Sequence, residues 1–202
     1  TASTVEVGVG RVVASVGVGG EPEGVELSPD GSVVYVTSEE DNEVFVIDAA
    51  KAVVLRRIGV DARPRSVVFL PDGARAYATC ENGGSVVVVD ARTHERLHTI
   101  KLTGESMRPM GAVASPDGRY VYVTTGRGRK VVTIDTATNE PIASIEVGQR
   151  PWGIAITPDG RELRYNDSLV AESIRDANGN EVRLLYDDDT GQLGEIVDTC
   201  NR

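Results

Sequence analysis

Arginine recurs immediately before a proline at three places in this chain, and guanidinium groups bind carboxylates and phosphates through paired hydrogen bonds. With the residues that follow those prolines, they form a candidate ligand-binding set: Arg63, Arg65, Arg108, Met110, Arg150 and Trp152. If these side chains face one opening, they can clamp a small anion with the Trp152 ring stacked beside it. The competing interpretation is structural, because each arginine can instead pair with an Asp or Glu of a neighbouring unit.

Both histidines of the chain lie in the segment His94-Glu-Arg-Leu-His98, which matches the zinc-protease motif H-E-x-x-H. That motif works on a helix, where residues four apart hold one metal ion. The repeat pattern of the chain places His94 in a hairpin turn and His98 in a strand, where their side chains do not converge. We therefore predict a chance match, and we expect no metal ion, no cofactor and no catalytic residue.

Three other groups of residues invite a chemical interpretation. Asp48, Asp90 and Asp135 recur at the end of one strand in each unit, which favours a structural hydrogen bond to the next turn. Asp187-Asp-Asp189 lacks the spacing of a calcium loop and is expected to be a solvated turn. Gly126-Arg-Gly-Arg-Lys130 is glycine-rich and basic, but no helix follows it, so we do not expect a phosphate-binding loop.

The candidate arginines open copies of one repeated unit, in which a proline is followed by a short strand and a Pro-Asp-Gly turn. The first prolines are Pro22, Pro64, Pro109 and Pro151, so the periods are 42, 45 and 42 residues. Repeats of about 40–50 residues that are rich in short strands indicate a propeller or a solenoid. The additional residues of the second unit fall within 102–108, in a loop between units, where insertions are tolerated.

Each unit contains the pattern of four short strands. In the first complete unit we expect strands at Gly24–Ser28, Ser32–Thr37, Val44–Asp48 and Val53–Val60. Pro29-Asp-Gly31 is a tight turn between the first two strands. Four antiparallel strands joined by hairpins are typical of a propeller blade. The sequence therefore predicts an all-β fold, a β-propeller of four-stranded antiparallel blades with about four blades, or a partial propeller.

The two ends of the chain depart from this unit. Val5–Val9 and Arg11–Val18 align with the third and fourth strands, so the chain begins within a repeat. The fourth unit offers inner strands at Gly153–Thr157 and Arg161–Tyr165. Beyond them we expect a C-terminal β-hairpin extension with strands at Leu169–Ile174, Glu181–Tyr186 and Gln192–Val197.

Ring closure has three solutions. The first is intramolecular: the fourth unit supplies inner strands and residues 4–18 supply the outer two, which gives a ring of four blades. In the second, the tail completes the fourth blade and two open half-rings pair into a dimer. The third is an open fragment. Open blade edges invite pairing with another chain, so a homo-oligomer formed through them is one of the expected outcomes.

Composition excludes several classes of function. The formal net charge is −10 and the pI is about 4.7, so the basic footprint of a nucleic-acid-binding protein is absent. No apolar run approaches the roughly 20 residues of a membrane-spanning helix, and no signal peptide is visible. Cys80 and Cys200 are too few for a metal site or a disulfide framework. We expect free thiols, and one bridge that ties down the C-terminus is the alternative.

Val33-Val-Tyr-Val-Thr37 and Tyr120-Val-Tyr-Val-Thr124 follow Pro-Asp-Gly turns, and Tyr77-Ala-Thr79 is a weaker copy between them. With these motifs, residues 4–160 resemble the YVTN family of β-propeller repeats. The resemblance implies a periplasmic, secreted or cell-surface protein that binds or scaffolds more than it catalyses. Some related propellers are lactonases or accompany quinoprotein dehydrogenases. This chain departs from the family in length, since it holds about half of the usual seven blades.

The tail carries Asp176-x-x-Gly-Asn180, Tyr186-Asp187, Gly191-Gln-Leu193 and Asp198, and it looks like the YD (RHS) repeat. Such repeats form β-shells in bacterial toxins and surface proteins. One or two copies are too few to enclose anything, so the chain is a fragment of a larger protein or a fusion. We divide it into propeller repeats, 1–165, and a tail, 166–202.

The sequence favours a non-enzymatic extracytoplasmic binding or scaffold module, whose partner is a protein or a small anionic ligand. The expected contact surface is the arginine-rich mouth of the central channel. The enzymatic alternative is a lactonase-like hydrolase that uses the same mouth, and it needs an acid–base or metal cluster there. The third alternative is a structural fragment of a larger surface or toxin protein, which functions by assembly.

Overall fold

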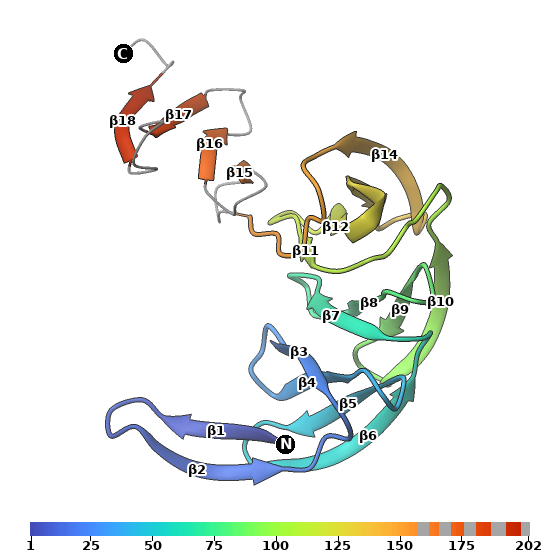
Figure 1. Ribbon diagram of the computed structural model, residues 1–202. Coiled ribbons are helices and arrows are strands. Elements are labelled where there is room, and N and C mark those ends of the chain that lie inside the picture. The colour runs from blue at the N-terminus through green and yellow to red at the C-terminus, as the bar shows by residue number, and fades with distance from the viewer. Residues whose placement is uncertain (157–161, 166–170, 176–180, 187–192, 199–202) are drawn as a thin grey trace.

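Short antiparallel strands build the chain, and valine dominates them because its branched side chain suits a pleated, buried surface. The computed structural model describes residues 1–156, 162–165, 171–175, 181–186 and 193–198. These residues form a two-stranded sheet and four four-stranded sheets. The sheets follow one another in an arc, with β6, β10 and β14 on its outer side (Figure 1). The prediction of an all-β propeller with four-stranded antiparallel blades is confirmed.

The first three four-stranded sheets are blades 1 to 3, one for each predicted unit. Blade 1 contains β3 Pro22–Leu27, β4 Val33–Ser38, β5 Glu43–Asp48 and β6 Val53–Gly59. Blade 2 contains β7 Pro64–Phe69, β8 Arg75–Cys80, β9 Ser85–Asp90 and β10 Glu95–Lys101. Blade 3 contains β11 Ala112–Ala114, β12 Tyr120–Thr124, β13 Lys130–Asp135 and β14 Glu140–Glu146, with the 3-10 turn η1 at Gly126–Gly128.

The ends of the chain form two further sheets. β1 Ala2–Glu6 and β2 Arg11–Val16 pair as a hairpin. β15 Glu162–Tyr165, β16 Ala171–Arg175, β17 Glu181–Tyr186 and β18 Leu193–Asp198 form a four-stranded sheet in chain order. The domain boundary at residue 165 stays a prediction, and β15 and β16 pair across it.

Two expected strands at the ends of the chain are wrong in position. The strand expected at Val5–Val9 is β1, which ends at Glu6, because the next four residues form a turn. Gly10 donates to the Glu6 carbonyl at 2.8 Å and has a φ of +62°, which glycine adopts without strain. The strand expected at Gly153–Thr157 is reduced to a single bridge at Ile156, and Thr157 lies outside the described residues.

The pairing of the described strands does not support closure of the propeller through a blade that is shared by the two ends of the chain. β1 pairs with β2, and β15 pairs with β16, so the described strands of residues 4–18 and of the fourth unit do not share a sheet. The tail strands form a four-stranded sheet with β15, and the pairing of two half-rings into a dimer stays a prediction. The turn expected at Asp176–Asn180 and the acidic segment Asp187–Asp189 lie outside the described residues.

Two hydrophobic cores lie between successive blades. Tyr35, Val46 and Phe69 belong to the core between blades 1 and 2. Tyr77, Val88 and other buried side chains pack against blade 3 in the second core. Burial of such side chains between neighbouring sheets is what fixes the blades side by side.

Threonine hydroxyls join the innermost strands of successive blades. Thr79 Oγ1 accepts a hydrogen bond from the Ser66 N–H at 3.0 Å and donates to the Met110 carbonyl of blade 3 at 2.5 Å. Thr124 Oγ1 likewise accepts from the Gly111 N–H at 2.9 Å and donates to the Trp152 carbonyl at 2.8 Å. These bonds place residues 151–153 beside β11, where the innermost segment of a fourth blade belongs.

Tyrosine hydroxyls join the blades nearer their opposite end. Tyr35 OH lies 2.7 Å from His94 Nδ1 in the hairpin turn of blade 2. Tyr77 OH donates to Asn139 Oδ1 in the corresponding turn of blade 3, at 2.8 Å. His94 and Asn139 both have a positive φ, 57° and 58°. The predicted register is confirmed, because His94 precedes β10 in a turn and His98 lies within that strand.

The recurring strand-end aspartates cap the turns that follow them, as predicted. Asp48 Oδ1 accepts from the N–H groups of Ala50 and Lys51 at 3.0 and 2.8 Å. Asp90 and Asp135 make the same pair of bonds to the residues two and three positions later. These side chains therefore hold hairpins in shape, which explains their recurrence without a catalytic role.

Candidate ligand-binding mouth

The residues singled out by the sequence lie at one end of the blades, which we call the mouth. It consists of the segments that enter the innermost strands, 60–65, 102–110 and 147–152, and of the turns 38–42, 81–84 and 125–130. Antiparallel strands bring these loops together, because each innermost strand starts where the next strand ends. The Pro-Asp-Gly turns lie at the opposite end of the blades.

Arg65 is the centre of an ion-pair network at the mouth. Its side chain is 9% exposed. Its Nη1 lies 2.8 Å from Glu23 Oε1 and 2.6 Å from Glu39 Oε2, and its Nε donates to Glu81 Oε2 at 2.8 Å. A buried guanidinium that bridges three carboxylates is a structural element, since its removal leaves buried charges without a partner.

Arg63 and Arg108 extend the same network at its edges. Arg63 Nε contacts Glu39 and lies 3.4 Å from Glu81 Oε2. Arg108 Nη1 donates to Asn82 Oδ1 at 2.7 Å and lies 3.5 Å from Glu81 Oε1. Burial raises the pKa of Glu81, but the neighbouring arginines outweigh this effect and lower its pKa. The charges of these three arginines and three glutamates cancel within the mouth.

The structure brings Trp152 to this network and leaves Arg150 without an ion pair among the described residues. The guanidinium of Arg65 lies over the Trp152 ring, 5.3 Å from its centroid, and 49% of Trp152 is exposed. Met110, which was predicted to contact ligand, is 4% exposed and buried in the protein. Of the predicted set, Arg150 and Trp152 are thus the members that remain most open to a ligand.

Sequence reasoning offered pairing with a carboxylate of a neighbouring unit as the alternative to ligand binding, but it did not identify Glu39 and Glu81 as the partners. Glu39 and Glu81 each follow the recurring threonine, Thr37 or Thr79, by two positions, and alignment of the repeats exposes this spacing. The third copy has Gly126 at this position. The repeats therefore differ in charge at a position that faces the next unit's arginine.

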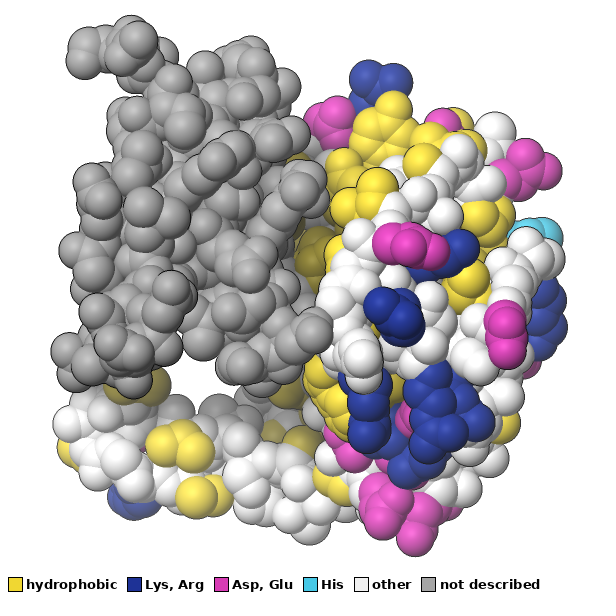
Figure 2. Space-filling model, turned by 45° about the horizontal axis from the view of Figure 1, so that its top comes forward, with side chains coloured by type: hydrophobic (Ala, Val, Ile, Leu, Met, Phe, Trp, Pro, Cys, Tyr) yellow, Lys and Arg dark blue, Asp and Glu magenta, His cyan; other side chains and the backbone are white. Residues whose placement is uncertain are grey.

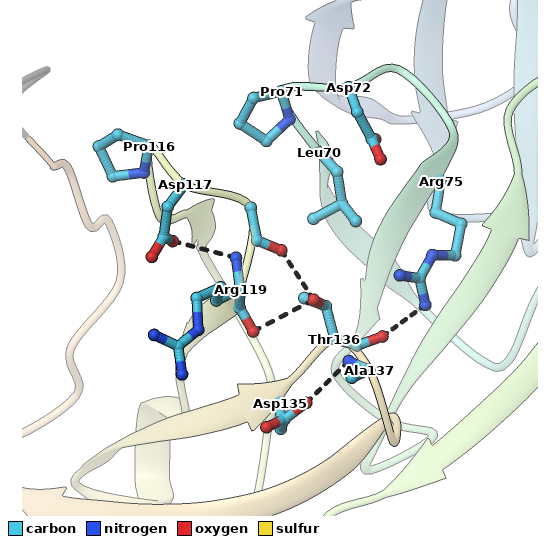
Figure 3. A pocket seen from close by; sticks show the side chains of 11 residues that line it. Leu70, Pro71, Asp72, Arg75, Pro116, Asp117, Arg119, Asp135, Thr136 and Ala137 are labelled. Atoms are coloured by element: carbon cyan, nitrogen blue, oxygen red, sulfur yellow. Dashed lines mark hydrogen bonds between the residues drawn. The ribbon is translucent and has the colours of Figure 1, made fainter.

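A groove lies at the opposite end, between the Pro-Asp-Gly turns of blades 2 and 3 (Figure 3). Its volume is about 640 Å3. Arg75 Nη1 of blade 2 donates to the Thr136 carbonyl of blade 3 at 2.6 Å, which joins the two blades, and within blade 3 Thr136 Oγ1 donates to the Gly118 carbonyl at 2.7 Å. Asp117 accepts from the Arg119 N–H at 3.0 Å. We assign this groove to the blade interface.

The described residues contain no cluster of three or more His, Cys, Asp or Glu side chains that is suited to a metal ion. Burial raises the pKa of the Cys80 thiol to about 12, so it is a protonated core residue, and Cys200 lies outside the described residues. Among the described helices none has the length and apolar character of a membrane span.

Comparison with known proteins supports the propeller architecture. The family model of the cytochrome D1 heme domain, a β-propeller family, matches residues 77–169, which is less than half of the chain. No curated protein matches the sequence significantly.

Solved structures match over most of the chain. Hydrazine synthase of Kuenenia stuttgartiensis has a TM-score of 0.67 and 25% identity, and the match covers 91% of this chain and 51% of that one. A putative 6-phosphogluconolactonase from Bacteroides uniformis has a TM-score of 0.65 and 18% identity, with coverage of 93% and 60%. A structure of U3-55K has a TM-score of 0.63 and 13% identity, with coverage of 83% and 52%. This chain is similar in fold to these proteins and spans between half and two thirds of their lengths.

Proposed function

We propose that this chain is a non-enzymatic binding module that contacts a small anionic ligand or a protein partner at its mouth. The observation that carries the proposal is that Arg150 is exposed and has no ion pair among the described residues, and that it lies two positions before Trp152, whose ring is half exposed. An unpaired guanidinium offers a fork of N–H donors that suits a carboxylate or a phosphate, and an exposed aromatic ring offers a flat apolar surface.

Binding is better supported than hydrolysis. A lactonase-like hydrolase requires an acid or base that is free to exchange a proton. The glutamates described at the network are instead tied to arginines, and the pKa of Glu81 is lowered. The similarity to a putative lactonase is at 18% identity and supports the shared fold, not the reaction.

The repeat families and the location of the protein are part of the same proposal. The Tyr-Val-Thr segments on β4 and β12 favour membership of the YVTN repeats, and the tail motifs favour a YD repeat. Both resemblances imply an extracytoplasmic protein, periplasmic, secreted or at the cell surface. Because the chain spans about half of hydrazine synthase, a role as one section of a larger assembly is the competing proposal.

Calorimetric titration with citrate tests the function. We expect saturable binding with one site that weakens as salt is added, because an exposed charge pair is screened by ions. A parallel assay with a simple lactone should show no hydrolysis above the buffer rate. Lactone turnover by the purified chain, or the absence of saturable binding of citrate and of other small polyanions, would count against the proposal.

A further inference from the structure

At the mouth, blades 1 and 2 each place a glutamate near the arginine that precedes the next blade, and blade 3 has no glutamate at that position. Glu39 of blade 1 contacts Arg63, the arginine that precedes the proline of blade 2. Glu81 of blade 2 lies 3.5 Å from Arg108, which holds the same position before blade 3. At the same register blade 3 has Gly126, so this position offers no carboxylate to Arg150, and Arg150 forms no ion pair among the described residues.

The net charge of the turns at the mouth changes from negative in blades 1 and 2 to positive in blade 3. The turn after β4 carries Glu39, Glu40 and Asp41, a charge of −3, and the turn after β8 carries Glu81, a charge of −1. The segment after β12 instead carries three cations, a charge of +3: Arg127, Arg129 and Lys130. None of these three forms an ion pair with any described residue, in a protein whose net charge is −10. Figure 2 shows Lys and Arg side chains gathered in one region of the described surface.

Backbone contacts hold these cations beside the segment that carries Arg150. The Val147 N–H donates to the Arg129 carbonyl at 2.9 Å, and Val147 precedes Arg150 by three residues. The Gly111 N–H donates to the Trp152 carbonyl at 3.0 Å, so the same segment is fixed on blade 3. Two neighbouring loops therefore present four cations and one aromatic ring.

Resting on the proposed function, we infer that the ligand site of the mouth is centred on blade 3 and takes a small, multiply charged phosphate or carboxylate anion. The cations of this site are Arg127, Arg129, Lys130 and Arg150, and we call them the blade 3 basic cluster. Arg63, Arg65 and Arg108 serve as scaffold, because their charges are already matched by Glu23, Glu39 and Glu81. Several unpaired cations on adjacent loops select for an anion with more than one negative group.

The tryptophan supplies a direct readout. Trp152 is the single tryptophan of the chain, and it lies two residues from Arg150. Its emission is recorded while inorganic pyrophosphate or citrate is added at constant ionic strength. We expect a saturable change with at least one of these two anions, and none when chloride alone is raised. A response to pyrophosphate only identifies phosphate as the ligand group, and a response to citrate only identifies carboxylate.

Matched variants locate the site. Arg150→Gln and Arg129→Gln should each weaken binding about tenfold or more, since each removes a charge-assisted contact. Arg127→Glu, which puts a carboxylate into the cluster, should weaken it at least as much. Arg92→Gln is the control, because it makes the same change on an exposed arginine at the opposite end of the blades. Circular dichroism checks that every variant remains folded.

The outcomes separate this inference from the proposed function. Unchanged affinity in Arg150→Gln and Arg129→Gln, with loss in folded Arg63→Gln or Arg108→Gln, overturns the blade 3 site but keeps an anion-binding mouth. Failure of the unmodified chain to bind either anion overturns both.

Discussion

Single hydroxyl groups connect the blades. Each one forms a hydrogen bond within its own blade and a second with a backbone carbonyl of the next unit. Thr79 and Thr124 do so at the mouth, where each bonds its own blade and the next one. Because the Thr79 side chain is fully buried, the groups that it bonds have no access to water when it is lost.

Thr79→Val tests this linkage. Valine keeps the shape and the strand preference but leaves the Met110 carbonyl unpaired, so we expect a loss of about 1–3 kcal/mol in the free energy of unfolding. Urea denaturation measures it. Thr133→Val on β13 is the matched control, since the Thr133 hydroxyl forms no hydrogen bond with a described residue, and it should change stability little. Equal effects of the two substitutions would refute the interblade role of Thr79.

His94 makes one blade interface sensitive to pH. Burial, followed by the charge of Arg56, lowers the pKa of His94 below its usual value, and Asp90 opposes this effect. The neutral ring is thus favoured in the folded state. Its contribution to stability is complete above the unfolded pKa of about 6.5 and is lost as the pH falls through the lower folded pKa.

His94→Asn gives blade 2 the residue that blade 3 has in Asn139. We expect little change in the free energy of unfolding at pH about 7.5, and a smaller loss than in the unmodified chain on going to pH about 5.5. Tyr35→Phe, which removes the hydrogen bond, should cost about 1 kcal/mol at the higher pH. Urea unfolding at both pH values provides the comparison. An identical pH-dependent loss in His94→Asn and the unmodified chain would exclude this role.

At the scale of elements, the innermost strands approach each other so closely that two blades use glycine at the contact. A Cβ atom on Gly111 would lie 2.6 Å from the Trp152 carbonyl oxygen, and one on Gly24 would lie 2.8 Å from the Arg65 carbonyl oxygen. Blade 2 has Ser66 at the same register, so its contact with blade 3 accommodates a side chain.

Gly111→Ala should therefore push the 151–153 segment away from β11 and cost about 1–3 kcal/mol in the free energy of unfolding. Gly153→Ala is the control at the same register of the next unit, where a Cβ would meet nothing within 4 Å. Thermal denaturation of both variants distinguishes them. If Gly153→Ala is as destabilising as Gly111→Ala, close packing is not the cause.

The repeated pattern of turns and strands in the sequence was enough to predict most of the fold. The Pro-Asp-Gly turns and the strand pattern predicted the four strands of blade 1 to within about two residues, and the repeat spacing predicted blades 2 and 3 as further copies, because the turn residues fix where each hairpin ends. The tail strand Glu181–Tyr186 was predicted with the bounds that it has. The fourth unit was less predictable, since its sequence departs from the repeat after Gly160 and β15 pairs with the next strand along the chain, β16.

The candidate site was predicted in part. The arginines before the prolines were found from their position, and the structure brings Arg63, Arg65 and Arg108 together. The sequence position of an arginine does not reveal whether its side chain already forms an ion pair. That depends on Glu39 and Glu81, which lie on turns of the preceding units and become neighbours only when blades pack side by side.

At the scale of the whole molecule, the N-terminal hairpin is an exposed apolar edge. Val5, Val12 and Val13 are 49%, 55% and 51% exposed. Hydrophobic side chains are visible on this hairpin at the lower left of Figure 2. A free edge strand with apolar side chains is prone to pair with another chain.

We expect concentration-dependent self-association of the chain through this hairpin. Val5→Lys combined with Val12→Lys should shift the protein toward the 21.5 kDa monomer in light scattering on a size-exclusion column. Leu97→Lys on the outer strand β10 is the control, since Leu97 is 54% exposed away from the hairpin. A chain that stays monomeric at every concentration would remove the hairpin as an assembly surface.

Anion binding by the mouth through blade 3 can be mapped by nuclear magnetic resonance of the backbone amides. Pyrophosphate and citrate are titrated in turn into labelled protein. For the anion that binds, we expect saturable shifts at residues 126–130 and 147–152 and none at the Pro-Asp-Gly turns of the opposite end. Shifts confined to those turns, or to the groove between blades 2 and 3, would contradict it.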